Sequence, residues 1–272
     1  MSEPNKPRLP VPSLVKEENH PIDVDGVTYD VLVGKPDGLP PNAPVVIILH
    51  GHGGSGHGMA QWTGFDALAA EHKFITVCPS AQEGWWHDAE PGPMQERDMK
   101  FFGKLFDAIP SYGGDPKRVY VCGHSNGGGM TYMLGGRYSE RIAAVMGAGA
   151  STGELDFSLN YYEVPKPKRP ISCMLVNGMK DDIHGYNMET FTVSLPDAAA
   201  WWARQIGATQ DEHKDMGNGL VDYTHYIGPQ KQEVILMGYR PMGHDWPSHM
   251  DQTSGLQANE LIWQFFERHP LP

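Results

Sequence analysis

The sequence predicts a single α/β domain, in which helices cover both faces of a mainly parallel open sheet. Six short segments are apolar at successive positions, which is the pattern of strands buried on both faces. Helix-like segments alternate with these runs, and this alternation calls for helices on both sides of one sheet. The chain of 272 residues is long enough to bury a large core. No repeat or linker interrupts residues 21–272, so we expect one domain there.

The expected elements begin after an N-terminal arm. Residues 1–20 are polar and punctuated by proline, which predicts a flexible arm. The segment 27–36 ("VTYDVLVGKP") alternates as an early strand should. The six buried strands are expected at 44–51, 74–80, 118–125, 142–151, 170–178 and 233–239. The helices are expected at 64–72, 96–109, 127–140, 195–207 and 258–269. In the second of these helices the apolar residues fall on one face, namely Phe101, Leu105, Phe106 and Ile109.

Composition excludes several classes of partner. The net charge of −12 argues against nucleic acid and anionic membrane, because both attract clustered Lys and Arg. No apolar run approaches the roughly 20 residues that span a bilayer. The first 20 residues contain no apolar signal core, which fits a cytoplasmic protein, although a leader trimmed from a longer precursor would fit a secreted one. Compartment and oligomeric state therefore stay open.

The three cysteines are expected to be buried small hydrophobic residues. Cys78, Cys122 and Cys173 are widely spaced, and each lies in an apolar strand-like run. This placement favours packing over a disulfide or a metal site.

The stretch "VYVCGHSNGGGM" (119–130) sets Ser125 between glycines, directly after a buried strand and before a helix. The pattern G-x-S-x-G in this context predicts a sharp turn that holds the serine in a strained conformation with its hydroxyl exposed. Gly123 and Gly127 are needed because side chains at those positions would collide across the turn. The alternative is a tight turn with a purely structural role, but the strand and the glycine-rich helix around it favour a nucleophile.

A serine nucleophile needs a base and a group that orients the base. Asp181 and Asp182 follow the strand at 170–178, and His244 follows the last strand. Each alone would be read as a surface loop residue. In the chain order serine, acid, histidine, each just beyond the carboxyl end of a strand, they predict a triad of Ser125, Asp181 and His244. We favour Asp181 over Asp182.

The oxyanion hole is expected to consist of two backbone N–H groups. One belongs to Asn126, at the start of the helix, and the other to His52, in the loop "LHGHGGSGHG" after the first long strand. His50, His52 and His57 could suggest a metal site, but no acidic cluster completes one. We therefore expect neither a metal nor a cofactor.

Several motifs together resemble the polyhydroxybutyrate depolymerase-like esterases, a group that merges into the feruloyl and acetylxylan esterases. These are "LHGHGGSG", "GHSNGGGM", "NGMKDD", "AAAWWARQIGA", "MGHDWPSH" and "IWQFFERHP", and the similarity runs from about residue 22 to the C-terminus. The resemblance implies the α/β-hydrolase fold and places Ser125, Asp181 and His244 at the triad positions. Two features depart from the family: His52 stands where members often have Cys, and the loop 83–93 ("EGWWHDAEPGP") is this chain's own.

The aromatic residues near the expected site predict how substrate is bound. Trp85 and Trp86 lie in the loop 83–93, where one exposed ring could stack on a sugar or an aromatic acyl group, although both could instead pack the loop against the body. Trp246 either braces the loop of His244 or lines the pocket. The insert 152–170 could be a partial lid carrying Tyr161 and Tyr162, and a pair in a distant helix is expected in the core, Trp201 and Trp202.

These observations predict a serine carboxylesterase that acts on a small-molecule or oligosaccharide ester, with acyl esters of carbohydrate (feruloyl or acetyl) favoured. The alternatives are a depolymerase of polyhydroxyalkanoate or another polyester, a peptidase or acyltransferase on the same machinery, and a catalytically silent binding protein. The acyl group and the alcohol stay undetermined.

Overall fold

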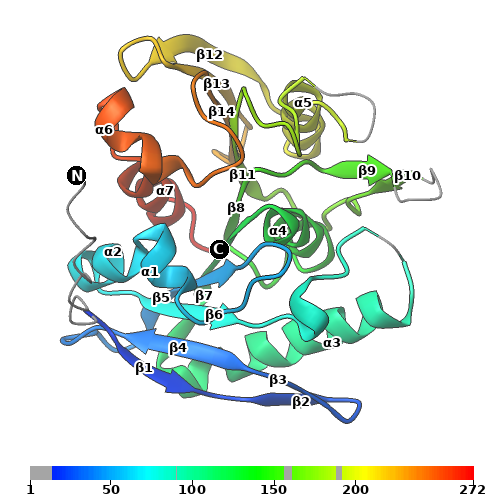
Figure 1. Ribbon diagram of the computed structural model, residues 1–272, viewed down its shortest axis with the longest axis vertical. Helices are drawn as coiled ribbons and strands as arrows, with labels where there is room; N and C mark the ends of the chain where they lie inside the picture. The colour runs from blue at the N-terminus through cyan, green and yellow to red at the C-terminus, as the bar shows by residue number, and fades with distance from the viewer. Residues whose placement is uncertain (1–13, 90, 156–160, 188–191) are drawn as a thin grey trace, which may run out of the picture.

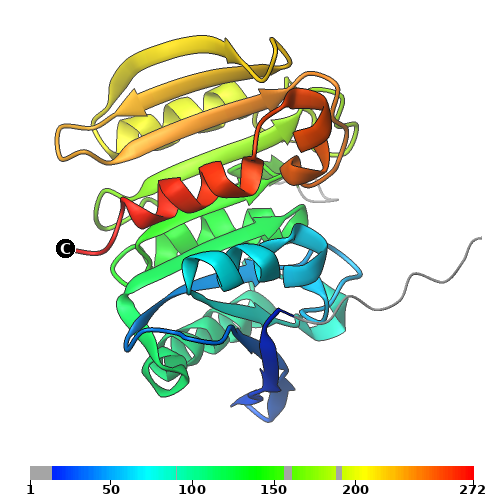
Figure 2. The ribbon, with the colours of Figure 1, turned by 90° about the vertical axis from the view of Figure 1, so that its left-hand side faces the viewer.

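The computed structural model describes residues 14–89, 91–155, 161–187 and 192–272. Its centre is a ten-stranded sheet with the order β1-β4-β6-β5-β7-β8-β11-β14-β13-β12, which runs from bottom to top in Figure 1. The chain has the α/β-hydrolase type of architecture that the sequence predicts, with one large sheet between two layers of helices (Figures 1 and 2).

The six central strands are parallel to one another, and each corresponds to a predicted apolar run. They are β6 (Ile75–Pro79), β5 (Ala43–Leu49), β7 (Gly114–His124), β8 (Ala144–Ala148), β11 (Ser172–Gly178) and β14 (Glu233–Tyr239). Neighbouring residues of β7 belong to opposite sides of the sheet, because Val119 and Val121 join one hydrophobic cluster whereas Tyr120 and Cys122 join the other. The continuous apolar runs therefore reflect burial of both faces.

Antiparallel strands cover both edges of the sheet. One edge is formed by β4 (Val31–Lys35) and β1 (Lys16–Asn19), and the other by β13 (Val221–Ile227) and β12 (Thr209–Met216). The prediction of a flexible arm over residues 1–20 is therefore wrong for residues 16–19, because they pair with β4. The hairpin β12–β13 was not predicted, since its outer strand is mostly polar. The strand expected at 27–36 is divided between β4 and β3 (Val27–Tyr29), which pairs with β2 (Ile22–Val24) in a small separate sheet.

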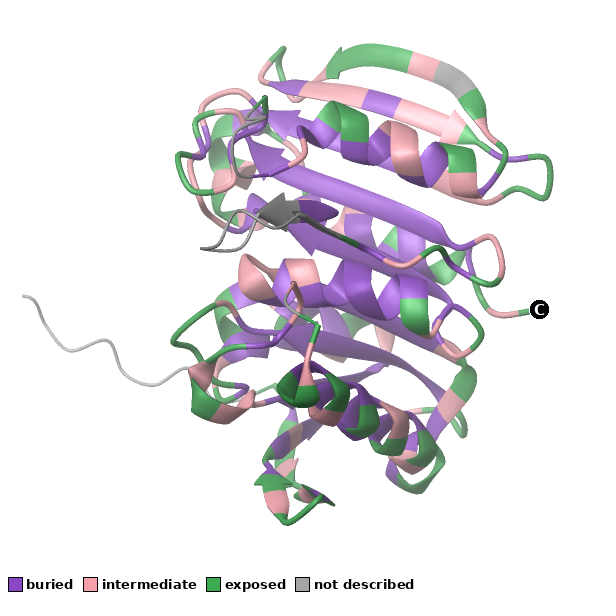
Figure 3. Ribbon diagram, turned by 90° about the vertical axis from the view of Figure 1, so that its right-hand side faces the viewer, coloured by how far each residue is buried: buried purple, intermediate pink, exposed green. Residues whose placement is uncertain are grey.

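Helices cover the two faces of the sheet in separate groups. Figure 3 shows one group in front of the buried strands: α3 (Pro93–Ala108), α4 (Asn126–Arg137) and α5 (Leu195–Gln205). The opposite face, seen in Figure 2, carries α1 (Met59–Thr63), α2 (Phe65–His72), α6 (Asp251–Ser254) and α7 (Ala258–Glu267). Short 3-10 turns complete the elements: η1 (Gln82–Gly84), η2 (Ile109–Tyr112) and η3 (Pro247–Met250). No helix in the described part of the chain is long and apolar enough to cross a membrane.

Each layer of helices closes its own hydrophobic core. The apolar face predicted for α3 is buried as expected, and so is Trp202 of α5, whereas its neighbour Trp201 is half-buried. The three cysteines are free and buried in the sheet, as predicted. Burying one large apolar side chain contributes about 1.5–3 kcal/mol to the free energy of unfolding. The two cores together therefore stabilise the sheet whose strands carry the candidate site at their carboxyl ends.

The chain crosses over at the centre of the sheet. The strand after β5 lies on one side of it, at β6, and the next, β7, lies on its other side. Where the chain order of the strands reverses in this way, a crevice forms beyond their carboxyl ends. Ligands of open α/β sheets bind in such a crevice. The loops after β6, β5 and β7 are therefore neighbours at one edge.

Within the insert expected as a lid, residues 156–160 lie outside the described part of the chain. The insert's described backbone forms a small two-stranded sheet of β9 (Gly153–Leu155) and β10 (Tyr161–Glu163). The side chains of Tyr161 and Tyr162 are outside the described part, and the lid stays a prediction.

Candidate active site

Ser125 occupies a strained turn between β7 and α4. Its backbone has φ 56° and ψ −127°, a conformation that costs a non-glycine residue on the order of 1–3 kcal/mol. The Ser125 N–H donates to Ala148 O at 2.9 Å, which ties the turn to β8. The hydroxyl of Ser125 is not hydrogen-bonded to any described residue.

The glycines around Ser125 are required by close backbone approaches. A Cβ at Gly123 would overlap the carbonyl oxygen of Gly127, as predicted for a tight turn. A Cβ at Gly127 would instead overlap the carbonyls of Leu49 and His50 at the end of β5. The turn is therefore pressed against the neighbouring strand as well as against itself.

Asp181 and His244 meet at the carboxyl edge of the sheet. Asp181 Oδ2 lies 2.8 Å from His244 Nδ1, and Asp181 Oδ1 accepts hydrogen bonds of 2.9 Å from the N–H groups of Ile183 and His184. Asp181 is 5% exposed, whereas Asp182 is exposed and makes no contact with His244. The geometry therefore pairs the histidine with Asp181.

The bonds to Asp181 determine its charge and the tautomer of His244. Burial alone would raise the pKa of Asp181, but the hydrogen bonds from His244, His184 and Ile183 outweigh it and hold the pKa below its usual range. An ionised carboxylate only accepts hydrogen bonds, so Nδ1 of His244 carries the proton. Nε2 of the neutral ring is then free to accept one.

Two further imidazoles pack against His244. The ring centroids of His124 and His184 lie 4.7 Å and 5.7 Å from that of His244. Burial, with His244 nearby, lowers the pKa of His124 to about 4 and also lowers the pKa of His184. Nε2 of His124 and Nδ1 of His184 are buried with no hydrogen-bond partner among the described residues. Both rings are therefore neutral at neutral pH.

The two N–H groups expected in the oxyanion hole are available. The N–H of Asn126 is the first of α4, and neither it nor the N–H of His52 has an acceptor in the described part of the chain. A helix N-terminus with free N–H groups favours negative charge nearby.

The three tryptophans expected to bind substrate have different surroundings. Trp85 is 36% exposed, and its ring centroid lies 6.0 Å from that of His52. Trp86 is fully buried, and its indole N–H donates to His50 O at 3.1 Å. Trp246 is also fully buried, and its indole N–H donates to Asn259 at 3.0 Å. Neither Trp86 nor Trp246 has a free face, so the structure contradicts a substrate contact for both and fits the alternatives, in which Trp86 packs its loop against the body and Trp246 braces the loop of His244.

Trp62 lies beside the site but was not predicted as a site residue from the sequence. It is 43% exposed at the end of α1, and its ring lies edge-on to His124 at 5.3 Å. It lines a hollow of about 420 Å³ together with His52, His57 and Met59. A tryptophan in a short helix beside the glycine-rich loop was the only available signal, since periodicity does not reveal exposure.

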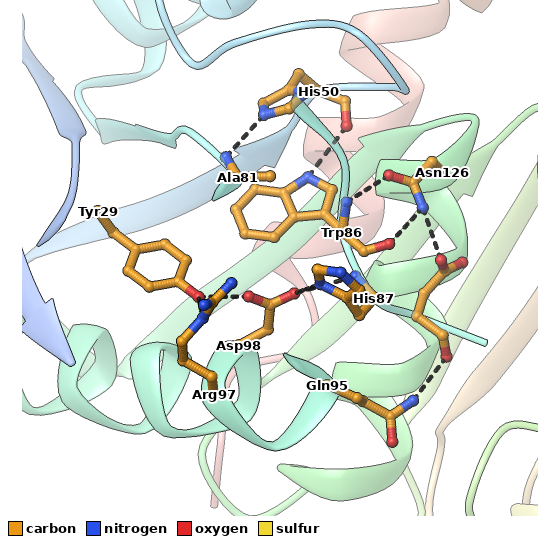
Figure 4. Close-up of polar contacts among 10 residues, drawn as sticks. Tyr29, His50, Ala81, Trp86, His87, Gln95, Arg97, Asp98 and Asn126 are labelled. Carbon is orange, nitrogen blue, oxygen red and sulfur yellow. Dashed lines mark hydrogen bonds and ion pairs between the residues drawn. The ribbon is translucent and has the colours of Figure 1, made fainter. Parts of the chain in front are cut away.

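The sequence also did not predict a network of polar contacts beside the site (Figure 4). The side chain of Asn126 bonds the main chain of Trp86 and the carboxylate of Asp88. Asp98 accepts bonds from the N–H of His87 and from the hydroxyl of Tyr29, and its carboxylate lies 2.9 Å from His87 Nδ1. These bonds join β3, α3 and the loop after β6 to the start of α4.

No family model matches the chain. The bifunctional acetylxylan esterase/xylanase XynS20E of Neocallimastix patriciarum is 28% identical over 88% of this chain and 33% of its own length. The putative esterase NocK of Nocardia uniformis is 29% identical over 77% of this chain and 67% of its own length. Over about 40% of this chain, feruloyl esterase B of Thermothelomyces thermophilus is 33% identical and poly(3-hydroxyalkanoate) depolymerase C of Paucimonas lemoignei is 30% identical, covering 40% and 28% of those proteins. The chain thus spans about a third of XynS20E and two thirds of NocK.

Among solved structures, the acetyl xylan esterase of Aspergillus awamori superposes with a TM-score of 0.68 over 92% of this chain and 99% of that one, at 15% identity. The architecture and this likeness show that the chain has the α/β-hydrolase fold. In sequence it is similar to acetylxylan and feruloyl esterases and to a polyhydroxyalkanoate depolymerase.

Proposed function

We propose that the chain hydrolyses carboxylic esters through a triad of Ser125, His244 and Asp181 and an acyl-enzyme. The observation that carries this proposal is the 2.8 Å contact between Asp181 Oδ2 and His244 Nδ1, at the same sheet edge as the strained turn of Ser125. A buried carboxylate that orients a histidine is the support that a serine nucleophile requires.

The reaction follows from the protonation states. Nε2 of His244 takes the hydroxyl proton as Ser125 Oγ attacks the ester carbonyl, and Asp181 stabilises the resulting imidazolium. The N–H groups of His52 and Asn126 bind the oxyanion. His244 then delivers the proton to the leaving alcohol, which departs and leaves an acyl-enzyme. Water attacks the acyl carbonyl while His244 takes its proton, and that proton returns to Ser125 as the acid is released.

The nucleophile is tested by Ser125→Ala. Hydrolysis of p-nitrophenyl acetate should fall by roughly 10⁴-fold or more, with an unchanged circular dichroism spectrum. A fluorophosphonate probe should add its mass to the wild type and not to the variant. A variant that keeps more than a tenth of the activity would rule out this mechanism.

Supplying an amine or alcohol acceptor in place of water separates an esterase from an acyltransferase.

The substrate class we propose is acyl esters of carbohydrate, acetyl or feruloyl. Named relatives are acetylxylan and feruloyl esterases, and two exposed tryptophans, Trp62 and Trp85, flank the glycine-rich loop. Exposed indole faces suit sugar rings and aromatic acyl groups, which they bind by area and stacking together.

The substrate proposal is tested by ranking kcat/KM for methyl ferulate, acetylated xylan and polyhydroxybutyrate film. We expect the soluble cell-wall esters to rank first. Faster clearing of the film would overturn this class and favour a polyester depolymerase, the activity that the name of the Paucimonas relative describes.

A further inference from the structure

The two proposed oxyanion donors belong to separate segments of the chain. His52 lies in the loop after β5, and Asn126 begins α4 after β7. An oxyanion hole works only when both N–H groups lie about 2.7–3.1 Å from the oxygen, so the distance between these segments has to be held to a few tenths of an ångström.

A third segment, residues 81–88 after β6, holds the loop of His52 by three hydrogen bonds. The N–H of Ala81 donates to Nε2 of His50 at 3.0 Å. The N–H of Gly53 donates to Gly84 O at 2.7 Å. The indole N–H of Trp86 donates to His50 O at 3.1 Å. The loop is thus held at His50 and at Gly53, on either side of His52.

The same segment is bound to the start of α4, and the bond again involves Trp86 (Figure 4). The side-chain oxygen of Asn126 accepts from the Trp86 N–H at 2.7 Å, and its amide nitrogen donates to Trp86 O at 2.8 Å. That nitrogen also donates to Asp88 Oδ1 at 2.6 Å. Trp86 is therefore bonded to both donor segments, to one through its side chain and to the other through its main chain.

Trp86 itself has little freedom to move. Its ring is fully buried, and its centroid lies 5.2 Å from that of Phe102 and 5.3 Å from that of His50. The next residue, His87, is tied to the buried Asp98 by its main-chain N–H at 3.0 Å and by its ring nitrogen at 2.9 Å. If the loop of His52 moved relative to the start of α4, the hydrogen bonds that Trp86 makes to His50 and Asn126 would break.

We propose that Trp86 is a positioning residue, which sets the separation of the two oxyanion donors by joining His50 to Asn126. This inference rests on the proposed function. Trp86 touches neither substrate nor reacting atoms, so its loss should lower the rate of the chemical step and leave ground-state binding unchanged.

The test is Trp86→Phe, which removes the indole N–H and keeps a buried ring. We expect kcat for p-nitrophenyl acetate to fall by about tenfold or more, less than the 10²–10³-fold loss of a whole oxyanion donor, with KM within about twofold. Trp202→Phe is the matched control. Trp202 is equally buried, but its indole nitrogen has no partner among the described residues, so kcat should be unchanged while the loss of ring volume is similar.

A phenylboronic acid provides a readout that a purely structural role would not change. It forms a tetrahedral adduct with the serine, and its inhibition constant should rise in Trp86→Phe in parallel with the loss of kcat/KM. Should Trp86→Phe fail to fold, Asn126→Ala removes the other connection and keeps the main-chain N–H, and the same losses are expected. If the folded variants keep kcat and boronate affinity within twofold of wild type, the inference is wrong. If Ser125→Ala is active as well, the proposed function has failed first.

Discussion

On the oxyanion side of the site the polar atoms of two loops and a helix start are joined by hydrogen bonds, whereas on the histidine side imidazole rings pack against one another. The oxyanion side consists of the loop of His52, the segment 81–88 and the start of α4. The histidine side consists of His244, its neighbours His124 and His184, and Trp62.

The difference matches the task proposed for each side. Donors that stabilise developing charge act best when they are fixed before the reaction, because reorganising them during it costs free energy. A base that takes a proton from one group and gives it to another has to keep one nitrogen free. Among the described residues, only Asp181, whose carboxylate is held by Ile183 and His184, fixes the His244 ring by hydrogen bonding.

The largest effect is expected when that one fixed contact is altered. In Asp181→Asn the amide oxygen should stay on the N–H groups of Ile183 and His184, so the amide NH₂ faces Nδ1 of His244. The proton of the imidazole is then forced onto Nε2, which no longer accepts one, and kcat should fall by about 10⁴-fold.

The matched control is Asp182→Asn, one residue along the chain and exposed. Steady-state kinetics of the two variants should differ by several orders of magnitude. Equal losses would show that charge in this turn, and not the bond to His244, is what matters.

A smaller effect is expected on stability, from His124. Folding lowers its pKa to about 4 from an ordinary value of about 6.5. Between these values the unfolded chain binds more protons than the folded protein, so stability falls as the pH falls from 6.5 towards 4. The contribution of His124 to this loss is about 2 kcal/mol between pH 7 and pH 5.

Urea unfolding at pH 7 and pH 5 measures this contribution. His124→Asn should lose about 2 kcal/mol less than wild type over this interval. The same pH dependence in both proteins would mean that His124 becomes charged in the folded state, and that the histidine side is more open to water than its packing indicates.

The smallest effect is expected from the exposed tryptophan on each side. Trp62 packs on His124, next to His244, the proposed donor of a proton to the leaving alcohol, whereas Trp85 packs beside His52 on the oxyanion side. Losing one stacking contact of about 0.5–1.5 kcal/mol corresponds to a rise of about two- to twelvefold in KM.

Trp62→Ala should therefore raise KM more for acetylated xylo-oligosaccharides than for methyl ferulate, and Trp85→Ala should do the reverse. p-Nitrophenyl acetate should be nearly unaffected by either change. If both variants alter both substrates equally, the two sides do not separate alcohol from acyl group.

Much of the fold was predictable because its determinants are local. Strands covered on both faces need apolar residues at every position, so β5, β7 and β11 are visible as runs. The edge hairpin β12–β13 was missed, because an exposed outer strand needs no such run. The same holds for β1, whose polar residues pair with β4 at the opposite edge.

The sequence by itself determined which residue types stand at the carboxyl ends of the strands: a serine between glycines, a carboxylate pair and a histidine. Tertiary structure alone decided which of them meet. It buried Asp181 against His244 and left Asp182 in solvent, and it buried Trp86 while leaving Trp85 half open. Adjacent residues in a loop have the same local signal, and their exposure depends on segments far away in the chain, here α3 beneath Trp86 and the loop after β14 beside Asp181. Burial is therefore a property of packing, which no single stretch of sequence carries.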